Sequence, residues 1–393
     1  MPHQDPPPPP PPSLSRPPLA LSAAAFVSTF DRFAITPMLV LIASGMGVPL
    51  GTAVAAASGY FLAYGLSQPL WGLLSDRFGR VRLMRVTLLA AAVAGALSTI
   101  APTMTVLIAA RVVAGACFGA VIPTSLTYVG DTVPGGQRQR ALSDLMAVSA
   151  LGTALATAVG GVLAHVLDWR MVFAMPAVCA AVCSFGLRSL PEPPRHAAAG
   201  MGEHLRAVLR NRWALLVFGL AFVEGAVLLG TMTLLAAALQ SRGVDSAVAG
   251  LATAAYGLGV VAFTRLVKAL TSRVPGWALI AVGGAQICVG YGVVAGRVEI
   301  VTVVVTALLL GGGWSFMHSS LQTWATSVVP RARGTAVAFF AAALFVGSSA
   351  ASAVAGPLAE HERYTLLFGI ASLAAIPLTL TAVTGRRRWL DHP

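Results

Sequence analysis

Four ionisable side chains lie within long apolar stretches of this sequence, where a charge is costly. Asp31 and Arg32 share one stretch, Arg111 lies in another, and Glu224 lies in a third. An ion at the centre of an apolar span costs about 2.5 to 3.5 kcal/mol, whereas one Leu or Val returns only about 0.3 to 0.6 kcal/mol. A carboxylate placed there can exchange a proton, because a nearby cation favours the ionised form and dehydration favours the neutral acid. We expect proton exchange at Asp31, with Arg111 biasing its ionisation; the alternative is a permanent pair with Arg32 or Arg111 that only fixes helix packing.

Glu224 is the acid of the second half of the chain that matches Asp31, and two interpretations of it stay open. It either couples to a proton or to substrate, or it remains a neutral acid that Thr231 and Thr233 satisfy. His318 is a further group that can titrate near neutral pH, although a hydrogen-bonded histidine in a packed core is the more common case.

Aromatic side chains near these groups could line a cavity for an amphipathic ligand, because their rings combine an apolar face with a polar tip. Tyr60 and Tyr64 are one helical turn apart, as are Trp314 and His318. The alternative is that these rings face lipid or pack in the core. The candidate substrate-cavity residues are Arg32, Phe30, Phe33, Tyr60, Tyr64, Trp314 and His318.

Motifs for enzymatic chemistry are missing from the sequence. The single lysine, Lys268, stands between Val267 and Ala269, so no phosphate-binding G-x-x-x-x-G-K-[ST] loop can form. The seven histidines are scattered, and the sequence contains no H-E-x-x-H, C-x-x-C or G-x-S-x-G motif. We therefore expect a protein that is not an enzyme, with no metal and no cofactor other than a proton as coupling ion.

The elements that must position these groups are membrane-spanning helices. The chain has 393 residues, of which 56% are hydrophobic and 10% charged, whereas soluble domains carry about 25% charged residues. A helix needs about 20 apolar residues to cross the roughly 30 Å hydrocarbon core of a bilayer. Hydropathy predicts an all-α membrane protein with twelve such helices. The expected spans are 18–43, 53–74, 83–103, 105–128, 141–165, 170–190, 213–239, 247–268, 276–296, 299–323, 334–358 and 364–384.

Basic residues are distributed unevenly between the two sides of this arrangement. The 26 Lys and Arg residues outnumber the 14 acids and give a net charge of +12. Apart from the two arginines inside spans, most of them lie in the termini and the even-numbered loops. Such loops face the cytoplasm, so we expect both termini there and no binding to nucleic acid. The basic residues in odd-numbered loops are Arg170, Arg242, Arg297 and Arg363.

Short internal repeats predict a duplicated architecture. Ala63-Tyr64-Gly65-Leu66 recurs as 255–258, and Val133-Pro134 followed by two arginines recurs at 329–333. We expect a Pro-rich cytoplasmic tail at 1–17, an N-terminal six-helix bundle at 18–190, a cytoplasmic linker at 191–212, and a C-terminal six-helix bundle with a short basic tail at 213–393. Where a membrane transporter is built from repeats of this kind, its substrate site lies near the bilayer midplane, between the repeats.

A charge-dense loop, Gly72 to Arg82, joins the second and third expected spans. Its sequence resembles the G-x-L-S-D-R-x-G-R-[RK]-x loop of the major facilitator superfamily. Gly72 leaves room for another helix to approach, and Asp76 could lie at the positive N-terminal end of the helix that begins near Gly334, joining the two halves. The candidate gating residues are Gly72, Asp76, Arg77, Gly79, Arg80 and Asp131.

Other tracts are similar to the drug:proton antiporter branch of the same superfamily. Leu107, Arg111, Gly115 and Gly119 match that branch's L-x-x-x-R-x-x-x-G-x-x-x-G pattern. The resemblance covers nearly the whole chain except the tail. It implies proton-coupled export of a small amphipathic molecule by alternating access, and a latch formed by Asp76, Arg80 and Asp131 that holds the outward-open state. Further matching tracts are Asp168-Trp169-Arg170, Glu224-Gly225 and His318 to Ala336.

One tract departs from that branch. In Gly152 to Gly161, Ala156-Thr157 stands where the antiporters carry a Gly-Pro pair, so the kink that such a proline imposes is not guaranteed. Proton-coupled import of a sugar or aromatic acid therefore stays open, as does a membrane receptor or scaffold that moves no ligand. We expect a monomer in a bacterial inner membrane that binds lipid and a small-molecule substrate of undetermined charge.

Overall fold

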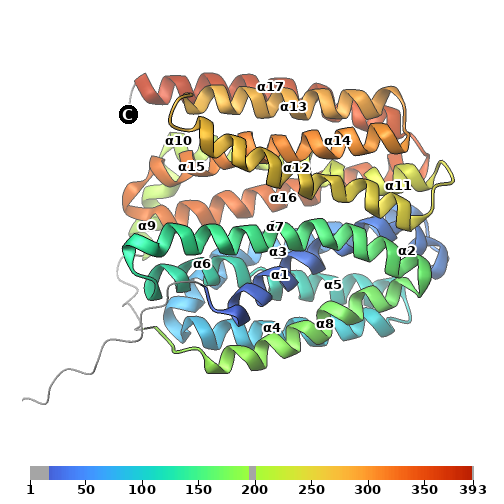
Figure 1. Ribbon diagram of the computed structural model, residues 1–393, viewed down its shortest axis with the longest axis horizontal. Coiled ribbons are helices and arrows are strands. Elements are labelled where there is room, and N and C mark those ends of the chain that lie inside the picture. Colours follow the sequence, from blue (N-terminus) through green and yellow to red (C-terminus); the bar gives the residue numbers. More distant parts are fainter. Residues whose placement is uncertain (1–16, 194–200, 392–393) are drawn as a thin grey trace, which may run out of the picture.

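The long apolar stretches form helices that lie side by side and cross the whole molecule (Figure 1). The computed structural model describes residues 17–193 and 201–391, and this part of the chain contains no strand. The expected N-terminal tail lies outside the described residues except for its last position.

The first half of the described chain contains eight α-helices and two short 3₁₀ turns, labelled η. Their bounds are α1 Leu19–Ala34, η1 Thr36–Met38, α2 Leu39–Met46, α3 Leu50–Phe78, α4 Arg80–Ile100, α5 Met104–Phe118, α6 Val121–Thr132, α7 Gly135–Val166, α8 Trp169–Gly186 and η2 Leu187–Ser189.

The second half has nine α-helices, two π-helical turns (η3 and η4) and one 3₁₀ turn (η5). Their bounds are α9 Met201–Arg210, α10 Arg212–Glu224, η3 Gly225–Gly230, α11 Leu235–Gln240, α12 Ser246–Leu270, α13 Gly276–Gly296, α14 Ile300–Gly313, η4 Trp314–His318, α15 Ser319–Val328, η5 Pro330–Ala332, α16 Arg333–Glu360 and α17 Tyr364–Asp391.

Eleven helical stretches of the described chain are long and apolar enough to cross a membrane. They correspond to eleven of the twelve expected spans. The remaining span is α3, which is 29 residues long but is less apolar because polar residues such as Gln68, Asp76 and Arg77 lie within it. Several spans are interrupted; the first breaks at η1, where Pro37 removes a backbone donor. α7, which lacks the antiporters' proline, runs for 32 residues without a break.

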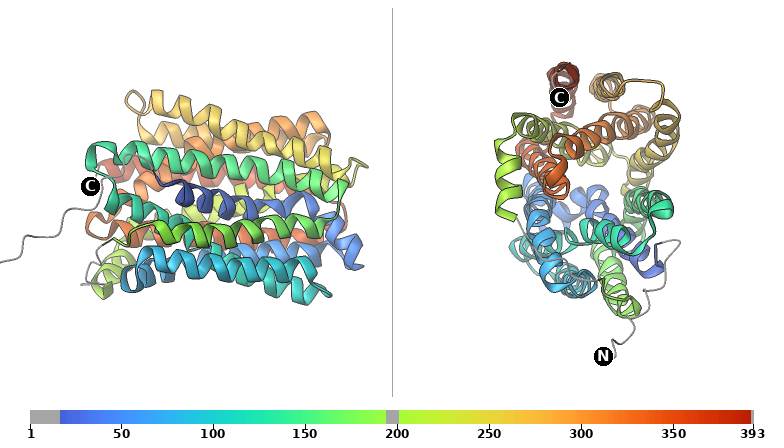
Figure 2. Two further views of the ribbon diagram at one scale, coloured as in Figure 1. Left: turned by 60° about the horizontal axis from the view of Figure 1, so that its bottom comes forward. Right: turned by 90° about the vertical axis from the view of Figure 1, so that its left-hand side faces the viewer.

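The helices gather into two bundles. Helices α1 to α8 form the N bundle and α10 to α17 form the C bundle. Figure 1 shows them as the blue-to-green half and the yellow-green-to-red half, and Figure 2 shows them end-on. The start of α1 and the end of α17 lie at the same end of the molecule, together with the loop between α3 and α4 (Figure 1). We call this the basic end and the opposite one the far end. Helix α9, within the segment expected as a linker, packs at the basic end against α16 and η5.

Two helix pairs join the bundles, since α3 packs on α16 and α7 packs on α12. A Cβ on Gly250 of α12 would lie 3.0 Å from the Gly161 Cα of α7, and only glycine allows helices to approach so closely. Two hydrogen bonds tie the bundles at this far end. The Ser246 hydroxyl donates to the Gly161 carbonyl at 3.2 Å, and Gln240 Nε2 donates to the Pro37 carbonyl at 2.9 Å.

The bundles are joined only from the far end to about the middle of the helices. There, Gly65 of α3 lies against Phe345 of α16, and Gly257 of α12 lies against Ala154 of α7. Nearer the basic end, no hydrogen bond, ion pair or aromatic contact links the two bundles within residues 17–193 and 201–391.

The expected contact between the halves at Gly72 is absent from this structure. A Cβ on Gly72 or on Gly334 would meet no atom of a neighbouring helix within 4 Å, and no side chain caps the start of α16 among the described residues. The prediction that Asp76 lies at the N-terminus of that helix and joins the halves is therefore wrong for this conformation, because the bundles are separate at the basic end.

Candidate functional site

Asp31 of α1 and Arg111 of α5 form a buried ion pair in the N bundle. Arg111 Nη1 donates to Asp31 Oδ1 at 3.0 Å, and Nη2 donates to Oδ2 at 2.8 Å and to the Asp31 backbone carbonyl at 3.2 Å. The two side chains are 0% and 1% exposed. Such bidentate pairing is the strongest geometry available to a carboxyl group and a guanidinium, and arginine stays protonated in proteins.

Aromatic rings enclose the Arg111 guanidinium. Its central carbon lies 4.6 Å from the ring centre of Tyr60 and 4.7 Å from that of Phe173, distances at which a cation is attracted to a ring face. Arg111 Nε and the Tyr60 hydroxyl have no hydrogen-bond partner among the described residues. Of the two cations considered for Asp31, Arg111 is therefore the partner.

Arg32, the neighbour of Asp31, points into the seam between the bundles. Its guanidinium lies 5.0 Å from the ring centre of Phe33, 4.9 Å from Tyr64 and 5.1 Å from Phe345 of the C bundle. No carboxylate pairs with Arg32 in the described part of the chain. The two adjacent charged residues of α1 thus have different surroundings: one is neutralised, and the other is held by aromatic rings.

Glu224 of α10 and His318 of η4 meet in the C bundle. His318 Nδ1 lies 3.2 Å from Glu224 Oε2, and the side chains are 8% and 0% exposed. The other carboxylate oxygen, Oε1, has no hydrogen-bond partner among the described residues. The alternative in which Thr231 and Thr233 satisfy Glu224 does not hold in this structure, because neither hydroxyl bonds to the carboxylate and both donate to backbone carbonyls of their own segment.

The helices of the second pair depart from α-helical geometry at the pair itself. Glu224 is the last residue of α10 and is followed by the π-helical turn η3, while His318 closes the π-helical turn η4. π-Helical turns are rare and often occur at functional sites. The imidazole of His318 stacks on Trp314, with ring centres 3.6 Å apart and planes 13° from parallel, and Phe340 lies 5.4 Å away.

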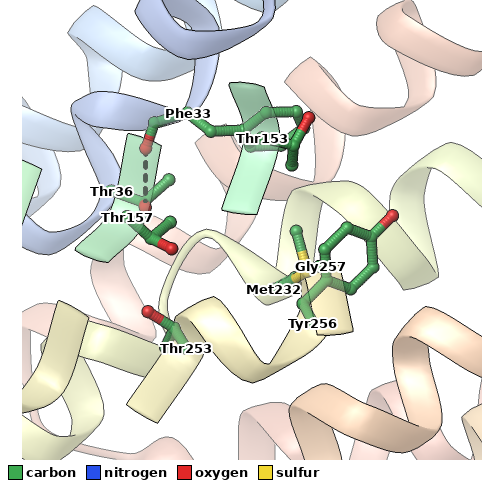
Figure 3. A pocket seen from close by; sticks show the side chains of 8 residues that line it. All are labelled: Phe33, Thr36, Thr153, Thr157, Met232, Thr253, Tyr256 and Gly257. Carbon is green, nitrogen blue, oxygen red and sulfur yellow. Dashed lines mark hydrogen bonds between the residues drawn. The ribbon is translucent and has the colours of Figure 1, made fainter. Parts of the chain in front are cut away.

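A small hollow lies between the bundles, lined by four residues from each (Figure 3). In this conformation it is barely large enough for one water molecule. Phe33 is the one candidate cavity residue that lines it; the other six do not border it and stay predictions as ligand contacts. The lining residues are Phe33, Thr36, Thr153, Thr157, Met232, Thr253, Tyr256 and Gly257.

Several of the lining residues were not predicted, although the sequence contains signals for them. Thr157 is one of the two residues that replace the antiporters' Gly-Pro pair, and Thr153 precedes it by one helical turn. Tyr256 and Gly257 belong to the repeated Ala-Tyr-Gly-Leu segment. A departure from a family pattern and an internal repeat therefore both lead to the interface between the bundles.

Arg80 connects the expected gating residues at the basic end. Its Nε lies 2.7 Å from Asp131 Oδ2 of α6, and its Nη2 lies 3.3 Å from Asp76 Oδ1 of α3. Asp76 is 39% exposed at its side chain, and such pairs near water contribute little stability. Arg77 packs instead over Phe78, with 5.5 Å between guanidinium carbon and ring centre. All these contacts lie within the N bundle.

Glu192 was not expected at this site. Gly79 has a φ of 98°, and its missing side chain leaves room for the Glu192 carboxylate. The two oxygens of Glu192 accept hydrogen bonds from the backbone N–H groups of Val81 and Arg82, each at 3.1 Å. This carboxylate therefore satisfies the N-terminus of α4, where negative charge is favoured. Within the described residues, no group of three or more His, Cys, Asp and Glu side chains could hold a metal ion.

The arrangement of helices in two bundles has counterparts among known proteins. Residues 21–352 match the model of the Major Facilitator Superfamily. The chain belongs to this superfamily. A chloramphenicol resistance protein of Streptomyces lividans is 29% identical over 384 residues, which are 93% of this chain and 97% of that protein. A puromycin resistance protein of Streptomyces alboniger is 28% identical over 58% of this chain and 47% of that protein.

A solved structure has the same fold across almost the whole chain. It is a bacterial homologue of the human lysosomal transporter Spinster in an inward-facing and unoccupied conformation, with a TM-score of 0.76 at 16% identity over 95% of this chain and 97% of that one. The protein is therefore a multi-pass membrane transporter of the major facilitator superfamily, and several of its curated relatives carry names of resistance or efflux proteins.

Proposed function

We propose that this transporter exports a small amphipathic molecule in exchange for protons by alternating access. The observation that carries the proposal is the presence in each bundle of a buried acid that is paired to a base. An intramembrane ionisable group marks an ion or substrate pathway, and Asp31, Arg111 and Glu224 form the charged centre of this one.

The bundles rock about contacts that lie at the far end in this conformation. The distribution of basic residues supports a cytoplasmic location for the basic end in the inner membrane of a bacterium. With that orientation the present structure is closed toward the outside, and the Arg80 cluster lies on the cytoplasmic side. An outward-open state then requires contacts at Gly72 and Gly334, where a neighbouring helix still has room.

The substrate contacts the hollow between the bundles after it widens. Threonine hydroxyls from both bundles line it together with apolar groups of Phe33 and Met232, a combination that suits an uncharged or weakly charged molecule with hydrogen-bonding groups on an apolar frame. The relatives named for chloramphenicol and puromycin resistance support this class.

Inverted membrane vesicles with an acidified lumen test the proposal. A panel of lipophilic cations, sugars and aromatic metabolites is added outside, and the lumenal pH is followed with a fluorescent dye. We expect at least one compound to dissipate the pH gradient in vesicles that contain the protein. Vesicles without the protein serve as control.

Right-side-out vesicles distinguish export from import. A symporter would carry protons inward when substrate is added outside them, and the same compound would leave the gradient of inverted vesicles unchanged. That result would replace export by import. Compound uptake that is independent of any pH gradient would contradict proton coupling.

A further inference from the structure

We propose that the proton exchanged during transport is shared by Glu224 and His318, whereas the Asp31–Arg111 pair stays ionised throughout the cycle. This inference rests on the proposed function and assigns its proton to one of the two buried pairs. It departs from the expectation that Asp31 is the proton carrier.

The contact between Glu224 and His318 is suited to a proton that comes and goes. A single contact of 3.2 Å joins the two side chains, and Glu224 Oε1 has no partner among the described residues. Imidazole changes its charge near physiological pH. Uptake of one proton from water turns carboxylate and neutral imidazole into carboxylate and imidazolium, and release of that proton restores the first state, so neither state leaves a lone cation in the protein.

The Asp31–Arg111 pair lacks this freedom. Protonation of Asp31 would give up at least one of two charge-assisted hydrogen bonds, at 3.0 and 2.8 Å, and would leave the guanidinium, which is fully buried, without a counter-charge. Removing one partner of such a pair is far more costly than keeping both. Because arginine does not release its proton, the pair has one stable charge state.

Few other ionisable groups act on the second pair. From α12, the buried phenol of Tyr256 lies within electrostatic range of both Glu224 and Arg32 of α1, and a phenol is uncharged at physiological pH. From α13, the Tyr291 hydroxyl is engaged with the Leu228 carbonyl at 3.0 Å. The buried residues of α16 include no ionisable side chain, those of α14 and α15 include none, and on α17 Arg386 stacks on Trp389.

The local backbone is irregular at both members of the pair. π-Helical turns adjoin Glu224 and contain His318, and such turns often occur at functional sites. His318 is the more exposed member, at 8% against 0% for Glu224, so protons reach the carboxylate by way of the imidazole.

Trp314 provides a direct readout that requires no substrate. A protonated imidazole quenches the fluorescence of an indole on which it stacks, and Trp314 lies 3.6 Å from His318. Purified wild-type protein is titrated from about pH 8 to about pH 5, the range in which histidine changes charge. We expect quenching on acidification that disappears in Trp314→Phe and in His318→Gln, and that shrinks severalfold in Glu224→Gln because an amide does not stabilise imidazolium.

Transport measurements provide the second readout. The labelled substrate is a compound identified with the vesicle panel. In proteoliposomes, Glu224→Gln and His318→Gln should still exchange it at equilibrium, at a rate that does not depend on pH. Its accumulation driven by a pH gradient should fall to the level seen when an ionophore removes the gradient. Glu360→Gln and His361→Gln are matched controls, since these are exposed side chains at the far end of α16, and should behave as wild type in both measurements.

A variant of the Asp31–Arg111 pair tests whether the fluorescence change is specific to Glu224 and His318. The double variant Asp31→Asn with Arg111→Gln removes both charges and avoids an orphaned guanidinium, and it should keep the full quenching. Quenching that survives in His318→Gln, or gradient-driven accumulation with a wild-type pH profile in Glu224→Gln, would overturn the proposal. Quenching that depends on both residues in a protein without any proton flux would support the shared proton and contradict the proposed transport instead.

Discussion

The two bundles place the same kind of pair at corresponding positions but build it differently. In the N bundle a carboxylate meets an arginine through two hydrogen bonds at 3.0 and 2.8 Å, and both residues lie within α-helices, α1 and α5. In the C bundle a carboxylate meets a histidine through one contact at 3.2 Å, and π-helical turns follow the acid and contain the base.

The difference indicates that a duplicated fold can assign structural stability to one bundle and proton exchange to the other. An arginine cannot lose its charge under physiological conditions, so in our proposal its pair holds helices together and keeps a constant charge. A histidine can gain or lose a proton near neutral pH, so its pair can change state. The comparison therefore predicts that damage to the N-bundle pair mainly affects stability, and damage to the C-bundle pair mainly affects coupling.

The largest effect is expected from Asp31→Asn. It leaves the Arg111 guanidinium buried without a counter-charge, which should destabilise the folded protein by about 3 to 5 kcal/mol. Thermal unfolding of the detergent-solubilised protein measures this as a large decrease in midpoint temperature. Asp31→Asn combined with Arg111→Gln should recover much of the loss; a double variant as unstable as the single one would show that the charge is not the cause.

Glu224→Gln should cost much less stability, about 1 kcal/mol, because a neutral histidine can still hydrogen-bond to the amide. The same thermal unfolding measurement checks it. A loss as large as that of Asp31→Asn would mean that His318 is permanently charged in the folded protein and would remove the contrast between the bundles.

The hollow offers a further comparison, since each bundle contributes threonines to it (Figure 3). The Thr157 hydroxyl is held by one long bond, 3.4 Å to the Ala154 carbonyl, whereas Thr253 donates to two carbonyls at 3.0 Å. We expect Thr157→Val to weaken substrate affinity by about 1 kcal/mol, one ordinary hydrogen bond, and Thr253→Val to weaken it less. Measuring the transport rate as a function of substrate concentration gives the apparent affinity of each variant. Equal losses in the two variants would show that the hydrogen bonds of these hydroxyls to backbone carbonyls do not limit their contact with the substrate.

The smallest effect is expected from Tyr60→Phe in the N bundle. Its hydroxyl is buried without a partner among the described residues, so its removal should leave stability unchanged or raise it by about 1 kcal/mol at most. Tyr291→Phe in the C bundle is the matched control, because it loses a 3.0 Å hydrogen bond to the Leu228 carbonyl and should destabilise by about 1 kcal/mol. Thermal unfolding of the two variants, measured side by side, shows whether each substitution raises or lowers the stability of the folded protein.

The helices and the buried charged positions followed from the sequence alone. A run of about 20 apolar residues has the length that a helix needs to cross a bilayer with its backbone satisfied, so the spans were predicted to within several residues. The ninth was predicted with the bounds that α13 has, 276–296. Asp31, Arg111, Glu224 and His318 stood out because ionisable groups are rare in such runs. The resemblance of the Gly72 to Arg82 loop indicated the family that the chain was found to match.

Only the tertiary structure decided which of these groups meet. Asp31 and Arg111 are 80 positions apart in the sequence, and Glu224 and His318 are 94 apart. Contacts between such distant residues depend on how the helices rotate and pack against one another. The spacing of residues along a single helix does not determine this packing. The same holds for the carboxylate of Glu192 beside Gly79 and for the open space at Gly72. Composition sets which ionisable side chains lie in a membrane, and packing between helices sets which of them are paired.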